Sequence, residues 1–308
     1  MNEYGGPQRV AVTVERVHGL AFAGVIQMKK FVLSLMFIFL SFRGVYAEND
    51  PRGAAAEKAR EKAMTTLSQH QVEALEAYER LQKSNPELFT GRVVRPLVLS
   101  HDALSAYASE HKIVLGVAAE TPYVFFIVDL VESRRSDGKT LQHPYLRVVS
   151  RGQLRGGINV VVIATIENPD LGAQGSVVMV TQERHALGAT EIGMPRGFGE
   201  PGLSGETNAL KELREETGYI GERATLLGSL NTDSGLTDSV VSYYYVSVLS
   251  RKTAKPETEE AIKAVSLLSR QDIWKAVRAG EIKDSFTLAA LSLYEAAQRE
   301  QASDTGKH

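Results

Sequence analysis

The sequence predicts an α/β domain with a mixed sheet over residues 119–300, preceded by a helical region over residues 53–118. Runs of β-branched residues alternate with turn residues through the middle of the chain. One helical stretch interrupts these runs, and helical periodicity returns near the C-terminus. Hydrophobic residues make up 43% of the chain and charged residues 23%, which is typical of a globular protein and excludes disorder of the whole chain.

Residues 1–52 have the features of a leader. A cationic start at Met28 precedes the apolar run FVLSLMFIFLSF (31–42), and small residues up to Ala47 precede a polar stretch. This order indicates a secretory signal peptide, translated from Met28 and cleaved near Ala47. The run is too short for a stable membrane span, which takes about 20 residues. A membrane-associated leader and a cytoplasmic protein with an apolar N-terminal helix are the alternatives, so export and a cytoplasmic location both stay open.

The region over residues 53–118 is expected to be mainly helical, because leucines and other apolar residues recur at helical spacing from Ala54 to Gln82. Asn85-Pro86 should end this segment, since proline disfavours the helical conformation of the residue before it. A second short helix is predicted to begin near Asp102.

Short runs with strand character follow, bounded by Gly, Asp, Asn and Pro. They are YVFFIVDLV (123–131), YLRVVS (145–150), GGINVVVIATI (156–166), SVVMVTQER (176–184) and SVVSYYYVSVL (239–249). Two helices, SRQDIWKAVRAG and SFTLAALSLYEAAQRE, close the domain, with Gly280 ending the first of them. Residues 301–308 are predicted to form a flexible tail.

Charge and cysteine content exclude several kinds of function. The formal net charge of −2 lacks the basic excess of a nucleic-acid-binding surface, so no nucleic-acid partner is expected. The chain has no cysteine, which excludes thiolate metal sites, disulfides and thiol nucleophiles.

A cluster of glutamates marks the helix between the strands, for which Ser204 is the expected N-cap and Gly218 the expected end. At helical spacing, Glu212, Glu215 and Glu216 fall within an arc about 100° wide, beside an apolar arc that faces the core. A solvated acidic face is one explanation, because exposed like-charge pairs cost only about 0.2–0.5 kcal/mol each. A magnesium site is the other, because the glycine-rich turn before the helix can add backbone oxygens to the carboxylates.

The stretch PRGFGEPGLSGETNALKELREETG (195–218) resembles the Nudix box, a glycine followed at fixed spacings by glutamates and a final glycine. The stretch aligns with the box without a gap, and the residues that match its pattern are Gly197, Glu212, Leu213, Glu215, Glu216 and Gly218. Leu203 and Lys211 depart from the pattern, which has a glutamate and an arginine at these positions. Glu200 and Glu206 are alternative sources of the missing carboxylate.

The resemblance implies a Nudix-type α/β/α sandwich and a hydrolase that cleaves a pyrophosphate linkage. It assigns Glu212, Glu215 and Glu216 as catalytic ligands of Mg²⁺, with Mn²⁺ as an alternative, and Gly197 as a backbone contact of the metal.

Flanking segments resemble the ADP-ribose pyrophosphatases within this family, so that the likeness covers about residues 125–297. VTQERHALG places Gln182 and Arg184 where the subfamily binds substrate, and Glu191 and Arg196 are further candidates for substrate contact. Ser234 stands where the subfamily has a proline, in a turn that keeps Gly235. The candidates for the water-positioning glutamate are Glu257, Glu259 and Glu260.

The expected partner is a small-molecule nucleoside diphosphate derivative, in the first place ADP-ribose, which would yield AMP and ribose 5-phosphate. NADH, dinucleoside polyphosphates and GDP-sugars are alternative substrates. A non-catalytic sensor of a nucleotide sugar is an alternative of another class, because Leu203 and Lys211 break the box. The subfamily resemblance also allows a homodimer.

Overall fold

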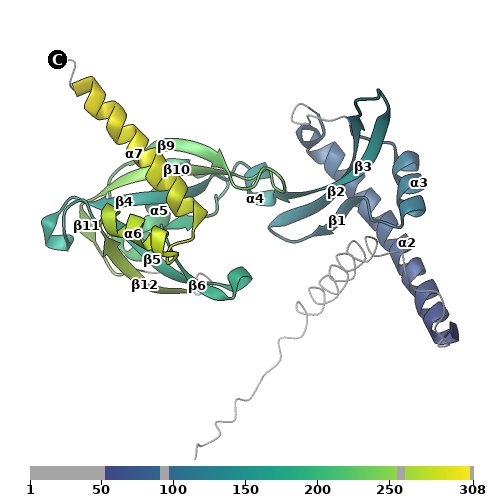
Figure 1. The fold of residues 1–308 in the computed structure, drawn as a ribbon, viewed down its shortest axis with the longest axis horizontal. Helices are drawn as coiled ribbons and strands as arrows, with labels where there is room; N and C mark the ends of the chain where they lie inside the picture. Colours follow the sequence, from purple (N-terminus) through teal and green to yellow (C-terminus); the bar gives the residue numbers. More distant parts are fainter. Residues whose placement is uncertain (1–52, 91–96, 255–260, 306–308) are drawn as a thin grey trace, which may run out of the picture. The chain divides into compact units, whose positions relative to one another are not determined.

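A computed structural model describes residues 53–90, 97–254 and 261–305 of the protein, with side chains described from residue 68 to residue 303 outside the gaps. The chain forms two units (Figure 1). The N-terminal unit extends to Ala119 and includes Ile127–Tyr145, whereas the C-terminal unit consists of Glu120–Phe126 and the chain from Leu146 onward. The predicted leader lies outside the described residues, and the boundaries expected at residues 52, 118 and 300 stay predictions.

The N-terminal unit packs helices against a small sheet. Helix α2 (Gly53–Ser84) ends immediately before Asn85-Pro86, and α3 (His101–His111) includes Asp102, so both predicted helices are confirmed. Leu75 and Tyr78 of α2 are buried in this unit. The sheet has the order β1-β2-β3 and consists of β1 (Gly116–Glu120), β2 (Val124–Arg134) and β3 (Thr140–Ser150).

The C-terminal unit is built on a seven-stranded mixed sheet in the order β12-β5-β4-β10-β9, to which β6 is added beside β5 and β7 beside β4. Strands β4 and β10 are parallel, and the other pairs are antiparallel. The predicted mixed sheet is therefore confirmed. The strands are β4 (Asn159–Ile166), β5 (Val177–Arg184), β6 (Ala189–Gly193), β7 (Arg196–Gly197), β9 (Ala224–Asn231), β10 (Val240–Val248) and β12 (Ile262–Leu268). A separate two-stranded ladder pairs β8 (Tyr219–Ile220) with β11 (Ser250–Arg251).

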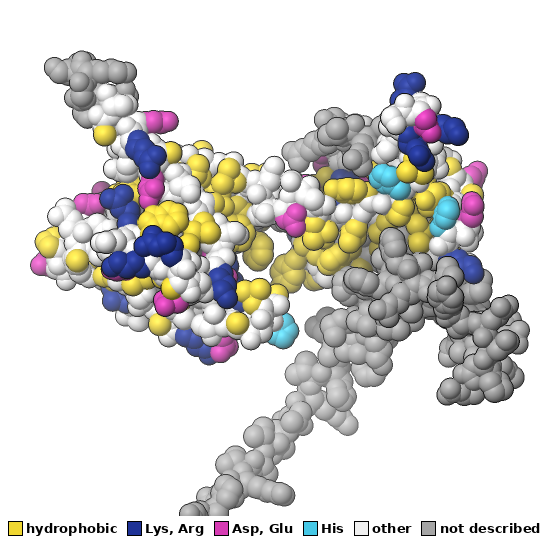
Figure 2. All heavy atoms as spheres, viewed as in Figure 1, with side chains coloured by type: hydrophobic (Ala, Val, Ile, Leu, Met, Phe, Trp, Pro, Cys, Tyr) yellow, Lys and Arg dark blue, Asp and Glu magenta, His cyan; other side chains and the backbone are white. Residues whose placement is uncertain are grey.

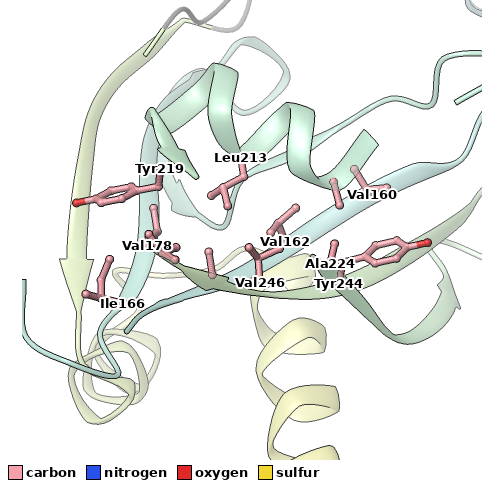
Figure 3. Packing of buried hydrophobic residues seen from close by; sticks show 12 residues of the cluster. Val160, Val162, Ile166, Val178, Leu213, Tyr219, Ala224, Tyr244 and Val246 are labelled. Carbon is pink, nitrogen blue, oxygen red and sulfur yellow. The ribbon is translucent and has the colours of Figure 1, made fainter. Parts of the chain in front are cut away.

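Helices cover both faces of the large sheet. Side chains of successive residues in β4 point to opposite faces, because a strand alternates with a period of two. Val162 packs on one face with Leu213 of α5 (Gly205–Thr217), as Figure 3 shows. Ile163 packs on the other face with residues of α6 (Arg270–Ala279) and α7 (Ser285–Thr305). The resulting α/β/α sandwich confirms the predicted fold class.

The ends of α5 and α6 follow the predicted capping residues. The Ser204 hydroxyl accepts a hydrogen bond from the backbone N–H of Thr207 at 3.1 Å and caps the start of α5. Gly218 and Gly280 end α5 and α6 with φ values of 76° and 74°, in the left-handed region that favours glycine. These caps fix where the glutamate helix begins and ends.

The visible surface of the C-terminal unit carries basic and acidic side chains interspersed with one another rather than gathered by sign (Figure 2). Among the helices in the described part of the chain, none is long and apolar enough to cross a membrane.

Candidate active site

The three box glutamates of α5 are largely withdrawn from solvent. Glu212 is 6% exposed and Glu216 2%, while the side chain of Glu215 is 26% exposed. A solvated acidic face would leave all three in water. Removing a carboxylate from water is unfavourable unless cations or hydrogen-bond donors compensate it. Burial therefore favours a built site over the solvated acidic face.

Strand β7 runs directly beside two of these carboxylates. The backbone N–H of Arg196 donates to Oε2 of Glu216 at 3.1 Å. A Cβ atom at Gly197 would lie 2.1 Å from Cδ of Glu212, so only glycine leaves room for this carboxylate. Pairing with β4, where Gly197 is in register with Val160, holds the backbone at this position.

The loop that follows β7 is anchored by two asparagines that the sequence analysis did not identify. The Asn208 side-chain amide donates to the backbone oxygens of Ile158 and Phe198, both at 3.1 Å. The Asn159 side-chain oxygen accepts the backbone N–H of Gly199 at 2.9 Å. These bonds connect segments far apart in the chain, so residue spacing gives no signal for them. They fix the glycine-rich turn relative to α5.

Lys211 lies among the carboxylates. Its Nζ is 2.6 Å from Oε2 of Glu215, 3.1 Å from Oε1 of Glu200 and 3.7 Å from Oε1 of Glu212. Burial opposes the charged form of Lys211, but hydrogen bonds to Glu215 and Glu200 outweigh it and raise the pKa of this ammonium above its usual range. Of the two alternatives considered for the missing carboxylate, Glu200 is the one that contacts Lys211, whereas Glu206 is exposed in the first turn of α5.

The donor set suits a hard divalent cation. Three carboxylates project from neighbouring turns of one helix, and the side-chain-free backbone of Gly197 lies against one of them. Oxygen ligands of this kind match Mg²⁺ or Mn²⁺, and the ammonium of Lys211 shows that a positive charge fits among them. As they stand, no three His, Asp or Glu side chains of the described residues converge on one point. Glu215 is ion-paired with Lys211, and Glu216 accepts a hydrogen bond from the backbone N–H of Arg196.

A second charged cluster lies on the other side of β7, around the Arg196 side chain. Its guanidinium donates to Oδ1 of Asp284 at 2.6 Å and to Oε2 of Glu191 at 3.4 Å, and lies 4.6 Å from the centre of the Phe286 ring. Asp284 is only 4% exposed and also accepts from the backbone N–H and hydroxyl of Thr287. Asp284 gives no signal in the sequence, because it lies 88 positions from Arg196 and no local pattern connects the two.

Arg184 joins this cluster through Glu191, whose Oε2 is 3.6 Å from Nε of Arg184. That nitrogen is buried and makes no hydrogen bond within the described part of the protein. Burial, and then the neighbouring charge of Arg196, lower the pKa of Arg184, whereas Glu191 opposes the shift. Gln182 is buried on β5, in register with Glu191 of β6. The structure thus brings these four candidates for substrate binding together.

The remaining candidates lie elsewhere or are not described. Ser234 and Gly235 form an exposed turn between β9 and β10, in which the Gly235 N–H donates to the Asp233 carboxylate at 3.0 Å. The candidates for water positioning, Glu257, Glu259 and Glu260, lie outside the described residues.

The chain on either side of those glutamates is attached close to the predicted site. A Cβ atom at Gly218, where α5 ends, would lie 3.0 Å from the backbone nitrogen of Ala254. The backbone oxygen of Ala261 accepts the N–H of Glu183, next to Arg184, at 3.2 Å.

The chain is similar to a known domain family and to several known proteins. The family model of the NUDIX domain matches residues 158–290. ADP-ribose pyrophosphatase of Bacillus subtilis is 32% identical over 130 residues, which cover 42% of this chain and 70% of that enzyme. Methanol dehydrogenase activator of Bacillus methanolicus is 29% identical over 166 residues, covering 53% of this chain and 79% of the relative. ADP-sugar pyrophosphatase of Mus musculus is 35% identical over 97 residues, which cover 30% of this chain and 44% of that enzyme.

The matched region contains the seven strands of the large sheet, the glutamate helix and the Arg196 cluster. More than two thirds of the Bacillus subtilis enzyme is covered at above 30% identity. Together with the buried box glutamates, these similarities establish that the chain belongs to the Nudix family and is a pyrophosphohydrolase that resembles the ADP-ribose pyrophosphatases.

Proposed function

We propose that the protein hydrolyses ADP-ribose to AMP and ribose 5-phosphate, with a divalent cation, Mg²⁺ or Mn²⁺, bound by Glu212, Glu215 and Glu216. The observation that carries this proposal is the burial of Glu212 and Glu216 against β7. Two buried carboxylates and a third beside them form a concentrated negative charge next to a backbone without a side chain, which suits a cation that in turn binds phosphate.

Hydrolysis of the pyrophosphate requires that water attack one phosphorus while the bond from that phosphorus to the bridging oxygen breaks. A bound divalent cation supplies charge neutralisation for the phosphate oxygens. The proton of the attacking water passes to a carboxylate, for which Glu257, Glu259 and Glu260 remain the candidates. The positions of the flanking residues support this choice, because Ala254 lies beside the end of α5 and Ala261 is hydrogen-bonded to β5.

Arg184 is proposed to hold the substrate diphosphate. Its side chain is 28% exposed, so that part of it can meet a ligand, and it is close enough to Glu216 for the two charges to interact. Arginine is suited to phosphate because its planar group presents donors in a fixed fork. Glu191 and Arg196 would orient Arg184 from one side. Gln182 and the turn at Ser234 and Gly235 stay proposed contacts of the substrate.

Other functions remain as alternatives to ADP-ribose hydrolysis. NADH, dinucleoside polyphosphates and GDP-sugars share the pyrophosphate linkage, and the subfamily proline is absent at Ser234. The departures from the box at Leu203 and Lys211 are the reason to keep the sensor alternative, in which a nucleotide sugar binds without turnover. Export through the predicted signal peptide and assembly as a homodimer also stay predictions.

A hydrolysis assay with the purified full chain separates these alternatives. ADP-ribose, NADH, a dinucleoside polyphosphate and a GDP-sugar are each incubated with and without Mg²⁺, and nucleoside monophosphate release is measured. We expect Mg²⁺-dependent release of AMP from ADP-ribose at the highest kcat/KM of the panel. A higher kcat/KM for another compound would identify that compound, and not ADP-ribose, as the substrate. Tight binding of ADP-ribose without release of AMP would favour the sensor.

A further inference from the structure

We propose that Lys211 is a built-in counter-cation that competes with the divalent ion for Glu215, and that Glu200 is the positioning residue that takes Lys211 over when the ion binds. This inference rests on the metal site of the proposed function. It concerns how the chain controls metal affinity.

In its one observed position, Lys211 contacts carboxylates both inside and outside the proposed metal site. Its ammonium is closest to Glu215, at 2.6 Å, and also reaches Glu200, at 3.1 Å. These two partners differ in surroundings, because the side chain of Glu215 is 26% exposed and that of Glu200 is 55% exposed. Glu215 belongs to the proposed metal cage, whereas Glu200 belongs to the loop outside it. Lys211 therefore bridges the cage and the loop.

Competition follows from charge and from lone pairs. A divalent ion ligated by Glu215 needs the oxygen that Lys211 now holds, and the ion and the ammonium repel each other at close range. When the ammonium leaves Glu215, its contact with Glu212 cannot replace that pairing, because Glu212 is itself a proposed ligand of the ion. Glu200 supplies another anion without movement of the loop, because the neighbouring backbone is fixed by Asn208 and Asn159.

The alternative role of Lys211 is simple support, in which the lysine only holds the carboxylates in place. The two roles predict opposite signs. Removing a support weakens divalent-ion binding, whereas removing a competitor strengthens it. Glu206 provides the matched control for Glu200. It is an exposed glutamate in the first turn of α5, the helix that carries Lys211, and it makes no ion pair with Lys211 in the described structure.

The experiment measures Mn²⁺ binding by electron paramagnetic resonance of the free ion, with the full-length chain and no substrate. The variants are Lys211→Gln, Glu200→Gln, Glu206→Gln and the double variant of Lys211 and Glu200. We expect Lys211→Gln to bind Mn²⁺ more tightly than wild type, by about two- to fivefold, which is the range for a partly exposed ion pair. Glu200→Gln should bind more weakly by a similar factor, and Glu206→Gln should change affinity by less than about twofold.

The double variant tests whether Glu200 acts through Lys211. We expect the effect of Glu200→Gln to disappear in the Lys211→Gln background, because a residue that acts through another is not additive with it. Weaker Mn²⁺ binding by Lys211→Gln would overturn the inference. So would an effect of Glu200→Gln that persists in full in the double variant, since that would be a direct charge effect.

The outcomes for the inference and for the proposed function are separable. Wild-type protein that binds Mn²⁺ but hydrolyses none of the compounds would overturn the hydrolytic function, and the affinities of the variants would still decide the role of Lys211. Wild-type protein that hydrolyses ADP-ribose, with Lys211→Gln binding Mn²⁺ more weakly, would overturn the inference alone. Wild-type protein that binds no Mn²⁺ would overturn both.

Discussion

The substitution Gly197→Ala tests how closely β7 and the glutamate helix fit together. The added methyl carbon would lie 2.1 Å from Cδ of Glu212 and 2.3 and 2.4 Å from its two oxygens. Carbon atoms that are not bonded approach one another to about 3.5 Å. The methyl group or the carboxylate must therefore move by more than about 1 Å.

Neither partner has free space for such a movement. Gly197 is held in register with Val160 of β4, and Glu212 is 6% exposed on a helix packed against the sheet. Overpacking of this kind costs about 1–3 kcal/mol. Reduced freedom of the unfolded chain returns about 0.4–1 kcal/mol when glycine becomes alanine. We expect a net loss of about 1–2 kcal/mol in the free energy of unfolding.

The affinity for Mn²⁺ should also fall, by about tenfold or more, because a displaced Glu212 no longer meets the ion. Urea unfolding and Mn²⁺ titration measure the two quantities on the same protein. Gly152→Ala is the matched control, since its added carbon would meet nothing closer than 3.6 Å. The reasoning is refuted if Gly197→Ala unfolds at the same urea concentration and binds Mn²⁺ as tightly as Gly152→Ala.

Three further predictions concern the second cluster and the core. Arg196→Met should lower the free energy of unfolding by about 3 kcal/mol in urea, because it leaves the buried Asp284 unpaired, and a loss below about 1 kcal/mol would contradict the burial argument. Arg184→Met should raise KM for ADP-ribose about tenfold with kcat little changed, as steady-state kinetics can show, and an unchanged KM would remove this residue from substrate binding. Burial raises the pKa of the Tyr243 and Tyr244 phenols, so their stabilising effect is complete below about pH 10 and is lost as pH rises toward the folded-state values. The phenolate absorbance of these two residues, taken as the difference between wild type and the Tyr243→Phe, Tyr244→Phe double variant, should therefore appear only together with the loss of circular dichroism, and its appearance in a still folded protein would contradict the prediction.

The sequence predicted helices whose ends are marked by capping residues. Helix α5 was predictable because Ser204 and Gly218 bound a periodic stretch, and Gly280 did the same for α6. Strand β10 was predictable from its run of β-branched and aromatic residues. By contrast, β9 and β12 were not predicted, because their assignment depends on pairing with β10 and β5 rather than on a local pattern.

The candidate site divides in the same way. The box spacing placed Glu212, Glu215 and Glu216 on one side of a helix, and the structure shows in addition that two of them are buried. Sequence could not choose between Glu200 and Glu206 as the source of the missing carboxylate, and in the structure only Glu200 of these two contacts Lys211. That outcome depends on the path of the loop after β7, which is fixed by hydrogen bonds with the side chains of Asn159 and Asn208. The Asp284 contact with Arg196 was equally hidden, since only the tertiary fold brings these residues together.

The most direct test of the account is the Mg²⁺-dependent hydrolysis of ADP-ribose by Glu216→Gln, measured beside Glu206→Gln. Glutamine keeps the size of the side chain and an oxygen that can accept the Arg196 N–H, but it removes the charge that the cation requires. We predict that turnover falls by more than about a hundredfold, since even outer-shell partners of a metal contribute about 10–100-fold, while the variant stays folded and Glu206→Gln keeps wild-type turnover. Wild-type turnover by Glu216→Gln would contradict the assignment of this helix as the metal-binding element.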